Sequence, residues 1–321
     1  MTKRNFDLEP LLERFRAGQR RALARLITEV DDGRHVDEIL AKVRRPDRRS
    51  LKIGITGAAG AGKSTTLAAL IKHLRSIGRT VAVLACDPAS PFTGGALLGD
   101  RVRMDYDPTD AGIYLRSFST RGASGGLSDS AEAIVQLVEQ FGFDVILMET
   151  VGAGQDQVSV QDLVDLLVLL VTPVAGDNIQ WEKAGLMEAA DVIVVNKADL
   201  PGADIAYAGL RAMLDLPGGA LEHHEVPVLK TSAATGQGVE ELWSALETMA
   251  KSVSKHRHRA AARRILEIAQ RRLAERFRRQ KDSNPAVMEI VSRFASGEAS
   301  ARVAADGLLK VLAEDNQRDT R

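Results

Sequence analysis

The residues with the clearest chemistry form a glycine-rich loop, Gly57-Ala58-Ala59-Gly60-Ala61-Gly62-Lys63-Ser64. The loop fits G-x-x-x-x-G-K-[S/T] and lies between a strand-like run, KIGIT, and a helix-like run, as a phosphate-binding loop requires. Its small residues let successive backbone N–H groups point at a β-phosphate, and the following helix adds its positive end. We expect Lys63 to reach the β- and γ-phosphates and the Ser64 hydroxyl to bind Mg²⁺. The predicted phosphate contacts are Gly57, Gly60, Ala61, Gly62, Lys63, Ser64 and Thr65.

Two short motifs further along the chain indicate the base. Asn196-Lys197-Ala198-Asp199 closes the run DVIVVN, and Thr231-Ser232-Ala233 follows VPVLK. The Asp199 carboxylate can accept hydrogen bonds from N1–H and the N2 amino group of guanine, whereas adenine has no such pair of donors. A site of this kind rejects the wrong partner by roughly 10⁴-fold or more, because its buried acceptor would stay unpaired. The motifs therefore predict GTP and GDP as ligands, with these contacts: Asn196, Lys197, Asp199, Ser232 and Ala233.

Acidic residues stand at the ends of two other strand-like runs. Asp87 follows TVAVLA, and Glu149 ends DVILMET. Ligands of α/β sheets bind at the carboxyl ends of strands, and an acid there can hold Mg²⁺ directly or through water. The turn 151–155 follows Glu149 and is expected to sense the γ-phosphate. The segment 116–128 is rich in Gly and Ser and is expected to be mobile until nucleotide or a partner orders it.

A second acid and a cation, Asp100 and Arg103, lie in the run LLGDRVRM. From the residues alone they could equally form a surface salt bridge.

These side chains need a scaffold that brings strand ends together. Short apolar runs alternate with helical stretches between residue 51 and about residue 250, which predicts an α/β fold with a mostly parallel sheet covered on both faces. Residues 8 to 46 repeat apolar side chains every three or four positions and predict a few short helices. The expected domains are an N-terminal helical extension at 1–50, a P-loop domain at 51–252 and a C-terminal helical arm at 253–321.

Composition excludes several classes of protein. The 321 residues include 43 Lys and Arg and 43 Asp and Glu, so no global field favours nucleic acid or an acidic membrane. No run approaches the roughly 20 apolar residues that span a bilayer, and the N-terminus lacks a secretory signal. We therefore expect a soluble, cytoplasmic protein. The single cysteine, Cys86, excludes an intramolecular disulfide and a cysteine-based zinc site.

The stretch 251–281 is strongly basic, with twelve Lys or Arg against two Glu. Read alone, it suggests an anionic partner. However, Ile265, Ala269, Leu273 and Phe277 recur at every fourth position beneath the charges, as in an amphipathic helix. We favour a helix that packs on another subunit or on a partner over one that binds RNA.

Taken together, the motifs resemble the MeaB/ArgK family, the methylmalonyl-CoA mutase-associated GTPases. The resemblance covers nearly the whole chain and rests on GITGAAGAGKSTT, DPASPFTGGALLGDRVRM, SFSTRGASGGLS, GFDVILMETVGAGQ, GDNIQ and NKAD. It implies a P-loop NTPase fold of the SIMIBI-type G domain with helical extensions at both ends. It also implies a GTP-hydrolysing chaperone that binds an adenosylcobalamin-dependent acyl-CoA mutase, gates cofactor loading and protects or reactivates the mutase.

The resemblance assigns residues and partners as well. The implied metal site is Ser64, Asp87, Asp100 and Glu149, and the implied catalytic residues are Lys63, Asp100, Glu149 and Gln155. A third switch is implied at 176–183, where Lys183 would link the two proteins. The C-terminal arm would form a homodimer. No cobalamin site of its own, no nucleic acid and no membrane are expected for this chain.

Two residues depart from the family pattern. Trp181 stands in the third switch, where a small or aliphatic residue is usual, and Cys86 precedes Asp87, where Val or Ala is usual. The client therefore stays open among methylmalonyl-CoA, 2-hydroxyisobutyryl-CoA, isobutyryl-CoA and ethylmalonyl-CoA mutases.

Two other functions compete with the chaperone. The first is a P-loop kinase for a small molecule, as an older family name, arginine or ornithine transport kinase, suggested. The chain shows no additional domain or lid to hold its acceptor. The second is a nucleic-acid-binding G protein, which predicts a salt-sensitive complex with RNA.

Overall fold

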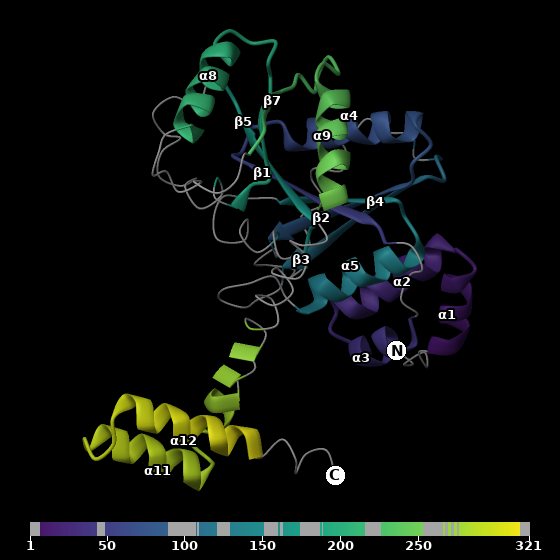
Figure 1. Ribbon diagram of the computed structural model, residues 1–321. Coiled ribbons are helices and arrows are strands. Elements are labelled where there is room, and N and C mark those ends of the chain that lie inside the picture. Colours follow the sequence, from purple (N-terminus) through teal and green to yellow (C-terminus); the bar gives the residue numbers. More distant parts are fainter. Residues whose placement is uncertain are drawn as a thin grey trace. The chain divides into compact units, whose positions relative to one another are not determined.

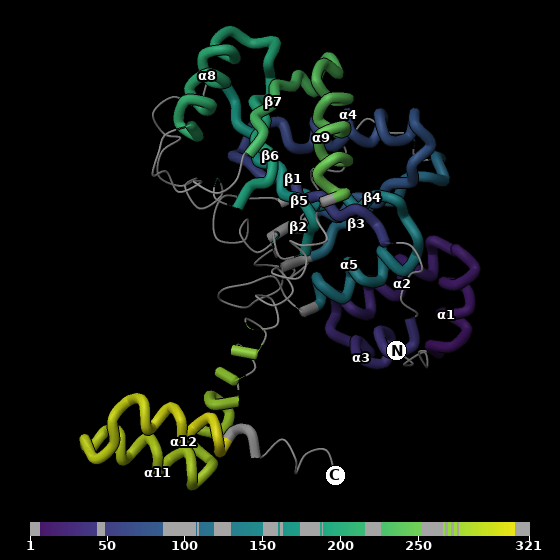
Figure 2. Tube along the Cα trace, viewed as in Figure 1, coloured from purple at the N-terminus to yellow at the C-terminus, as the bar shows by residue number. Residues whose placement is uncertain are grey.

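The computed structural model divides into two compact units, Met1–Ser254 and Lys255–Arg321. The described residues are 7–43, 49–88, 107, 109–120, 129–150, 160, 163–173, 187, 189–215, 226–252, 266, 269–270, 273–274 and 276–314. Only the backbone is described at 86–88, 119–120, 129, 150, 252 and 312–314. Figure 2 traces the backbone, with uncertain placements in grey.

The first unit is built on a seven-stranded parallel sheet (Figure 1), in the order β3-β2-β4-β1-β5-β6-β7. Its strands are β1 (Leu51–Gly57), β2 (Val81–Pro88), β3 (Ile113–Thr120), β4 (Val145–Thr150), β5 (Leu166–Val171), β6 (Val192–Val195) and β7 (Val228–Lys230). The chain runs from central β1 to one edge, returns at β4, and then builds the other edge from β5 to β7. The connections change direction at β1. Open α/β sheets bind their ligands at such a point, beyond the carboxyl ends of the strands.

Helices cover both faces of this sheet (Figure 1). One face carries α4 (Lys63–Ser76) and α9 (Val239–Ser252). The opposite face carries α5 (Asp129–Phe141), α8 (Ala203–Leu214) and the N-terminal helices α1 (Leu8–Arg16), α2 (Arg20–Asp31) and α3 (Val36–Lys42). Among the described helices, none combines the length and apolar character that crossing a membrane requires.

The strands are apolar on both sides, as a sheet between two helical layers must be. In β2, Val81 and Val83 pack into the core beneath α4 and α9, whereas Ala82 and Leu84 pack into the core beneath α2 and α5. The same alternation continues in the other strands. Burying one Val or Leu side chain stabilises the fold by about 1.5–3 kcal/mol, so the continuous apolar runs in the sequence supply both cores.

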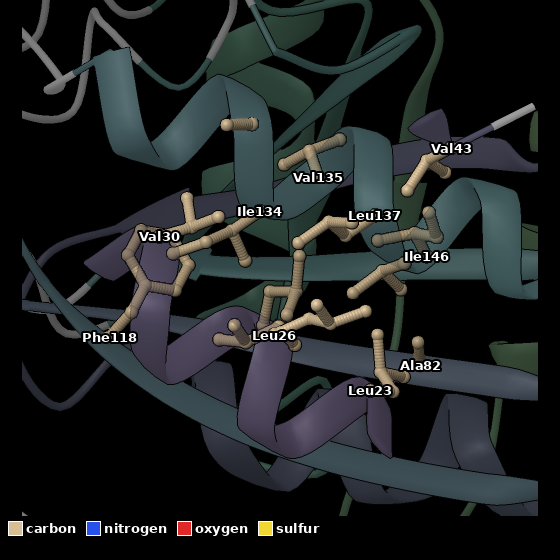
Figure 3. Packing of buried hydrophobic residues seen from close by; sticks show 14 of the residues in the cluster. Leu23, Leu26, Val30, Val43, Ala82, Phe118, Ile134, Val135, Leu137 and Ile146 are labelled. Carbon is tan, nitrogen blue, oxygen red and sulfur yellow. The ribbon is translucent and has the colours of Figure 1, made fainter. Parts of the chain in front are cut away.

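The N-terminal helices share the core of the first unit. Leu23, Leu26 and Val30 lie on one face of α2 and meet Ile134 and Leu137 of α5 (Figure 3). The spacing of three and four residues puts the α2 side chains on the same side of the helix. Helices α1 to α3 therefore share a core with α5 and with strands β2, β3 and β4.

Three aspartates close the amino ends of the strands. The Asp144 carboxylate accepts the backbone N–H of Thr80 at 2.8 Å, Asp165 accepts that of Lys52 at 2.9 Å, and Asp191 accepts that of Leu167 at 2.7 Å. Each aspartate stands directly before one strand and bonds to the start of its neighbour. These bonds fix the register between neighbouring strands.

Strand β3 corrects part of the sequence prediction, because the expected mobile segment 116–128 begins inside it. Tyr114 and Phe118 of β3 are buried beneath α2 and α5, and Leu115 packs on the opposite side. This alternation makes residues 113–120 a strand in spite of their serines. Residues 121–128 lie outside the described residues. Strand β2 likewise extends through Asp87 to Pro88, so Asp87 belongs to the strand end rather than following it.

The second unit contains a pair of helices, α11 (Pro285–Ala295) and α12 (Ala301–Glu314). Asn284 caps α11 by accepting the Ala286 N–H at 3.0 Å, and Pro285 occupies the first turn, where its missing N–H costs nothing. Val287 is fully buried, but Met288, Val291 and Phe294 of α11 are 43–51% exposed. The described part of this unit thus leaves an apolar face uncovered.

The packing of α2 predicts that the N-terminal helices unfold together with the sheet. Leu26→Ala should lower the free energy of unfolding by about 2–5 kcal/mol, because the leucine is fully buried. Arg21→Ala, on the exposed side of the same helix, should change it by less than about 0.5 kcal/mol. Denaturant unfolding followed by tryptophan fluorescence, with Trp243 buried under the sheet, is the measurement. An unchanged transition in Leu26→Ala would contradict a shared core.

Candidate nucleotide-binding site

The glycine-rich loop connects the end of β1 to the start of α4. Gly57, Gly60 and Gly62 have φ angles of 149°, 76° and 89°, in the region that favours glycine. A side chain at Gly57 would strike the Leu170 carbonyl oxygen, and one at Gly62 would strike the Asn196 amide nitrogen. The loop can therefore keep this shape only with glycine at both positions.

Lys63 and Thr66 hold the loop together from the first turn of α4. The Lys63 ammonium donates to the carbonyl oxygens of Gly57 at 3.0 Å and Ala58 at 3.2 Å. The Thr66 hydroxyl is buried and donates to Gly62 at 2.9 Å, whereas Thr65 is exposed. The positive ammonium and the positive end of α4 lie on the same loop, which is the arrangement that attracts phosphate.

Ser64 connects the loop to β4. Its hydroxyl donates to Glu149 Oε1 at 2.8 Å, and the Glu149 side chain is buried. Glu149 pairs in register with Ile55 of β1 on one side and Ala85 of β2 on the other. Donation by Ser64 leaves the lone pairs of its oxygen available to another group.

Asn196 links the phosphate end of the site to the base end. Its side chain is buried, and its amide nitrogen donates to the Ala61 carbonyl oxygen at 2.8 Å. Its amide oxygen accepts the Thr231 hydroxyl at 3.1 Å and the Ala233 N–H at 3.3 Å. One side chain of the first guanine motif, at the end of β6, therefore joins the glycine-rich loop to the second guanine motif.

The two guanine motifs also contact each other. Ala198 N–H donates to the Thr231 carbonyl at 2.9 Å, and Lys197 has a φ of 59°, unusual for a residue other than glycine. The pKa of the Asp199 carboxyl is lowered, chiefly because the Ser232 hydroxyl lies beside it, with smaller effects of its own backbone N–H and the Lys197 charge. The hydroxyl is buried and makes no hydrogen bond of good geometry. Asp199 therefore stays an ionised acceptor at neutral pH.

The structure brings together the two ends of the predicted site, from Lys63, Ser64 and Glu149 to Asn196 and Asp199. The backbone of Asp87 lies at the carboxyl end of β2, next to β4, and its side chain is not described. The remaining predicted residues, Asp100, Gln155, Trp181 and Lys183, lie outside the described residues. Within the described set, no three His, Cys, Asp or Glu side chains gather closely enough to form a metal site.

Sequence reasoning missed the buried links between these motifs. Asn196 was expected to contact nucleotide, but its bond to Ala61 spans 135 positions of the chain and leaves no local pattern. Thr66 has no signal apart from its place four residues after Gly62. Such links become visible only when the strand ends have been placed side by side.

Two glycine variants should separate backbone strain from collision. Gly60→Ala should cost about 1 kcal/mol of stability, because its φ is positive and nothing lies within 4 Å of the new Cβ. Gly62→Ala should cost about 1–3 kcal/mol more, because its Cβ displaces the Asn196 amide from its buried hydrogen bonds. Thermal unfolding without nucleotide measures both. Equal melting temperatures would show that the Asn196 link is not needed for the loop.

Comparison with known proteins agrees with the geometry. Residues 23–282 match the family described as methylmalonyl Co-A mutase-associated GTPase MeaB. A protein of Pyrococcus horikoshii that carries a GTPase name is 45% identical over 260 residues, covering 80% of this chain and 82% of its own. The mitochondrial methylmalonic aciduria type A homolog of Mus musculus is 32% identical over 320 residues, covering 92% and 77%.

A solved structure shares the fold. The crystal structure titled LAO/AO transport system kinase superposes with a TM-score of 0.67 at 25% identity, covering 99% of this chain and 100% of that one. The parallel sheet, the glycine-rich loop and the two guanine motifs are thus found together with a family match over most of the chain. The chain is a P-loop GTPase and belongs to the methylmalonyl-CoA mutase-associated GTPase family.

Proposed function

We propose that this GTPase is a chaperone of an adenosylcobalamin-dependent acyl-CoA mutase, and that its GTP cycle gates cofactor loading and protects or reactivates the mutase. The family description names methylmalonyl-CoA mutase, and the mouse relative is named after methylmalonic aciduria. The single observation that carries the proposal is the match over residues 23–282. Methylmalonyl-CoA mutase or a relative such as 2-hydroxyisobutyryl-CoA mutase is the proposed client.

The geometry supports the nucleotide contacts predicted from the sequence. Gly57 to Thr65 would hold the phosphates, with Lys63 as the cation that moves from loop carbonyls to phosphate oxygens. Asp199 would accept from the guanine ring, and the backbone of Ser232 and Ala233 would meet its O6 atom. Because Asn196 bonds to Ala61 and Ala233, the protein itself would fix the distance between a base seated against the second motif and the phosphate loop.

Magnesium fits the oxygen donors at the phosphate end. Ser64 and Glu149 are already joined by a hydrogen bond, and the hydroxyl keeps its lone pairs free for a cation. Hard oxygen ligands of this kind suit Mg²⁺. With Asp87 and Asp100 they would hold the ion, which would neutralise charge on the phosphates. Lys63, Asp100, Glu149 and Gln155 are the proposed catalytic residues.

The C-terminal unit is the proposed dimer contact. Met288, Val291 and Phe294 of α11 and Val303 of α12 are exposed, and apolar helix faces of this kind are usually covered by another surface. A second copy of the chain would cover them. We propose a cytoplasmic homodimer with no cobalamin site of its own and no nucleic-acid or membrane partner.

A kinase reaction on a small molecule remains the second candidate, because the related solved structure carries a kinase title. The two reactions differ in their products. A GTPase releases inorganic phosphate in proportion to GDP, whereas a kinase transfers that phosphate to an acceptor.

Nucleotide choice should depend on Asp199. In Asp199→Asn the amide can donate to the C2 oxygen of xanthine but no longer accepts both guanine donors. The variant should therefore bind GTP at least roughly 100-fold more weakly and prefer xanthosine triphosphate. Titration of wild type and variant with both nucleotides measures this, and Asp215→Asn, which changes an exposed carboxylate at the end of α8, is the matched control. Unchanged GTP affinity would remove Asp199 from the site.

The chaperone proposal predicts that the client accelerates hydrolysis. A mutase that orders Asp100, Gln155 and Lys183 around the γ-phosphate should raise phosphate release by roughly 10- to 100-fold. Lys183→Ala should keep the intrinsic rate but lose the stimulation. By linkage, GTP should in turn change the affinity of the mutase for adenosylcobalamin. Absence of stimulation of wild type by any such mutase would count against the chaperone, and equal stimulation of both proteins would count against Lys183.

A further inference from the structure

The turn between α1 and α2 concentrates positive charge in a chain that is neutral overall. Residues 13–22 read ERFRAGQRRA, with four arginines and one glutamate. Gly18 has a φ of 74°, and Gln19 N–H donates to the Arg14 carbonyl at 3.0 Å, so the turn is tight. All four arginines therefore lie within about one helical turn of Gly18. Arg14, Arg16 and Arg21 are exposed.

Among the described side chains, no carboxylate pairs directly with the arginines of this corner. Elsewhere in the unit, arginines pair closely with acids, as Arg75 does with Asp110 at 2.8 Å. Within the described residues, none of the four corner arginines makes an ion pair. Arg16 donates to the Lys42 carbonyl at 3.3 Å and Arg20 to the Asp110 carbonyl at 3.4 Å. The second terminal nitrogen of Arg20 is buried and has no partner.

Two described carboxylates near these charges, Glu9 and Asp110, are already bound by other cations. Glu9 is held by Lys42 at 2.9 Å, and Asp110 by Arg75. The charges of Arg16 and Arg20 act on them only as smaller contributions to their lowered pKa values, behind the bonds from Lys42 and Arg75. The corner therefore keeps a net positive field.

Arg14 and Arg16 lie in the last turn of α1, where cations are favourable, but the other two arginines do not favour the helix on which they stand. Arg20 and Arg21 open α2, whose first turn has no acidic residue and whose N-cap, Gln19, makes no side-chain cap. A helix N-terminus carries partial positive charge, so cations there are unfavourable. Arg20 contacts the Asp110 carbonyl, but folding of α2 gives no reason for the exposed Arg21 at its start, whereas recognition of an anionic surface does.

We propose that the three exposed arginines of the α1–α2 corner, Arg14, Arg16 and Arg21, dock an acidic surface patch of the mutase partner. This inference rests on the proposed function. Guanidinium groups pair with carboxylates through two parallel hydrogen bonds, which suits an acidic protein surface. Single-stranded nucleic acid would also need stacking platforms, and the aromatic side chain of this turn, Phe15, is buried.

The test compares two double variants that change the net charge equally. Arg14→Glu with Arg21→Glu reverses the exposed corner, and Arg211→Glu with Lys251→Glu reverses two exposed cations of α8 and α9. Affinity for a purified adenosylcobalamin-dependent acyl-CoA mutase is measured with a non-hydrolysable GTP analogue at low and high salt. The corner variant should bind about 10-fold more weakly at low salt, with a smaller difference at high salt, since screening weakens exposed charges. The control pair should bind like wild type, and intrinsic GTP hydrolysis should be unchanged in both.

Each other outcome has a defined meaning. Equal affinity of wild type and the corner variant overturns the docking site while leaving the chaperone intact, as does equal weakening by both variants. If wild type binds no such mutase, the proposed chaperone function fails, and the mutase is also ruled out as the partner of the arginine corner. If a short RNA binds wild type but not the corner variant, the corner is a nucleic-acid site and the proposed protein partner is wrong. If the corner variant has a lower melting temperature than wild type, the test is repeated with Arg14→Gln and Arg21→Gln. This pair removes positive charge without adding negative charge. The inference stands only if this second variant also binds the mutase more weakly than wild type.

Discussion

The buried amide of Asn196 is the constraint on which the nucleotide site depends. It bonds to the glycine-rich loop through Ala61 and to the second guanine motif through Thr231 and Ala233. A buried donor or acceptor that loses its partner costs about 1–3 kcal/mol, so movement of any of these segments alone is opposed. The requirement for glycine at position 62 follows from the same amide, which occupies the space of a Cβ. The distance between base and phosphate is thus set by the fold rather than by the ligand.

The sheet transmits this constraint because its strands are fixed at both ends. Asp144 precedes β4 and Glu149 lies near its other end, while Asp191 precedes β6 and Asn196 follows it. In both strands the acid stands five positions before the functional residue. The acid bonds to the backbone at the start of the neighbouring strand. It therefore fixes the position of the functional residue along the strand, relative to that neighbour. The residues that fix the strand register and the residues that carry the predicted functional side chains thus lie in the same segments, 144–149 and 191–196.

Sequence reasoning predicted the parallel sheet, the phosphate loop and the order of the motifs, because each depends on local patterns. The apolar run KIGIT followed by GAAGAGKS is typical of a strand, a phosphate-binding loop and the start of a helix. Strand β3 was missed, since Arg116 and the serines of RSFST outweigh the alternation of Tyr114, Leu115 and Phe118 in a linear reading. The sequence also did not predict that α2 and α5 share one core. An apolar helix face shows that the helix packs on something, but it does not indicate which surface it packs against.

The bond between Ser64 and Glu149 joins the glycine-rich loop to a buried strand end. A carboxylate as buried as Glu149 requires hydrogen-bond partners, and Ser64 supplies one from the first turn of α4. The same serine stands beside the lysine that faces the loop carbonyls. The Ser64 hydroxyl therefore links the first turn of α4 directly to the end of β4. Glu149 is held in turn by the pairing of β4 to both β1 and β2, so the carboxylate that meets Ser64 stands on a strand with a neighbour on each side.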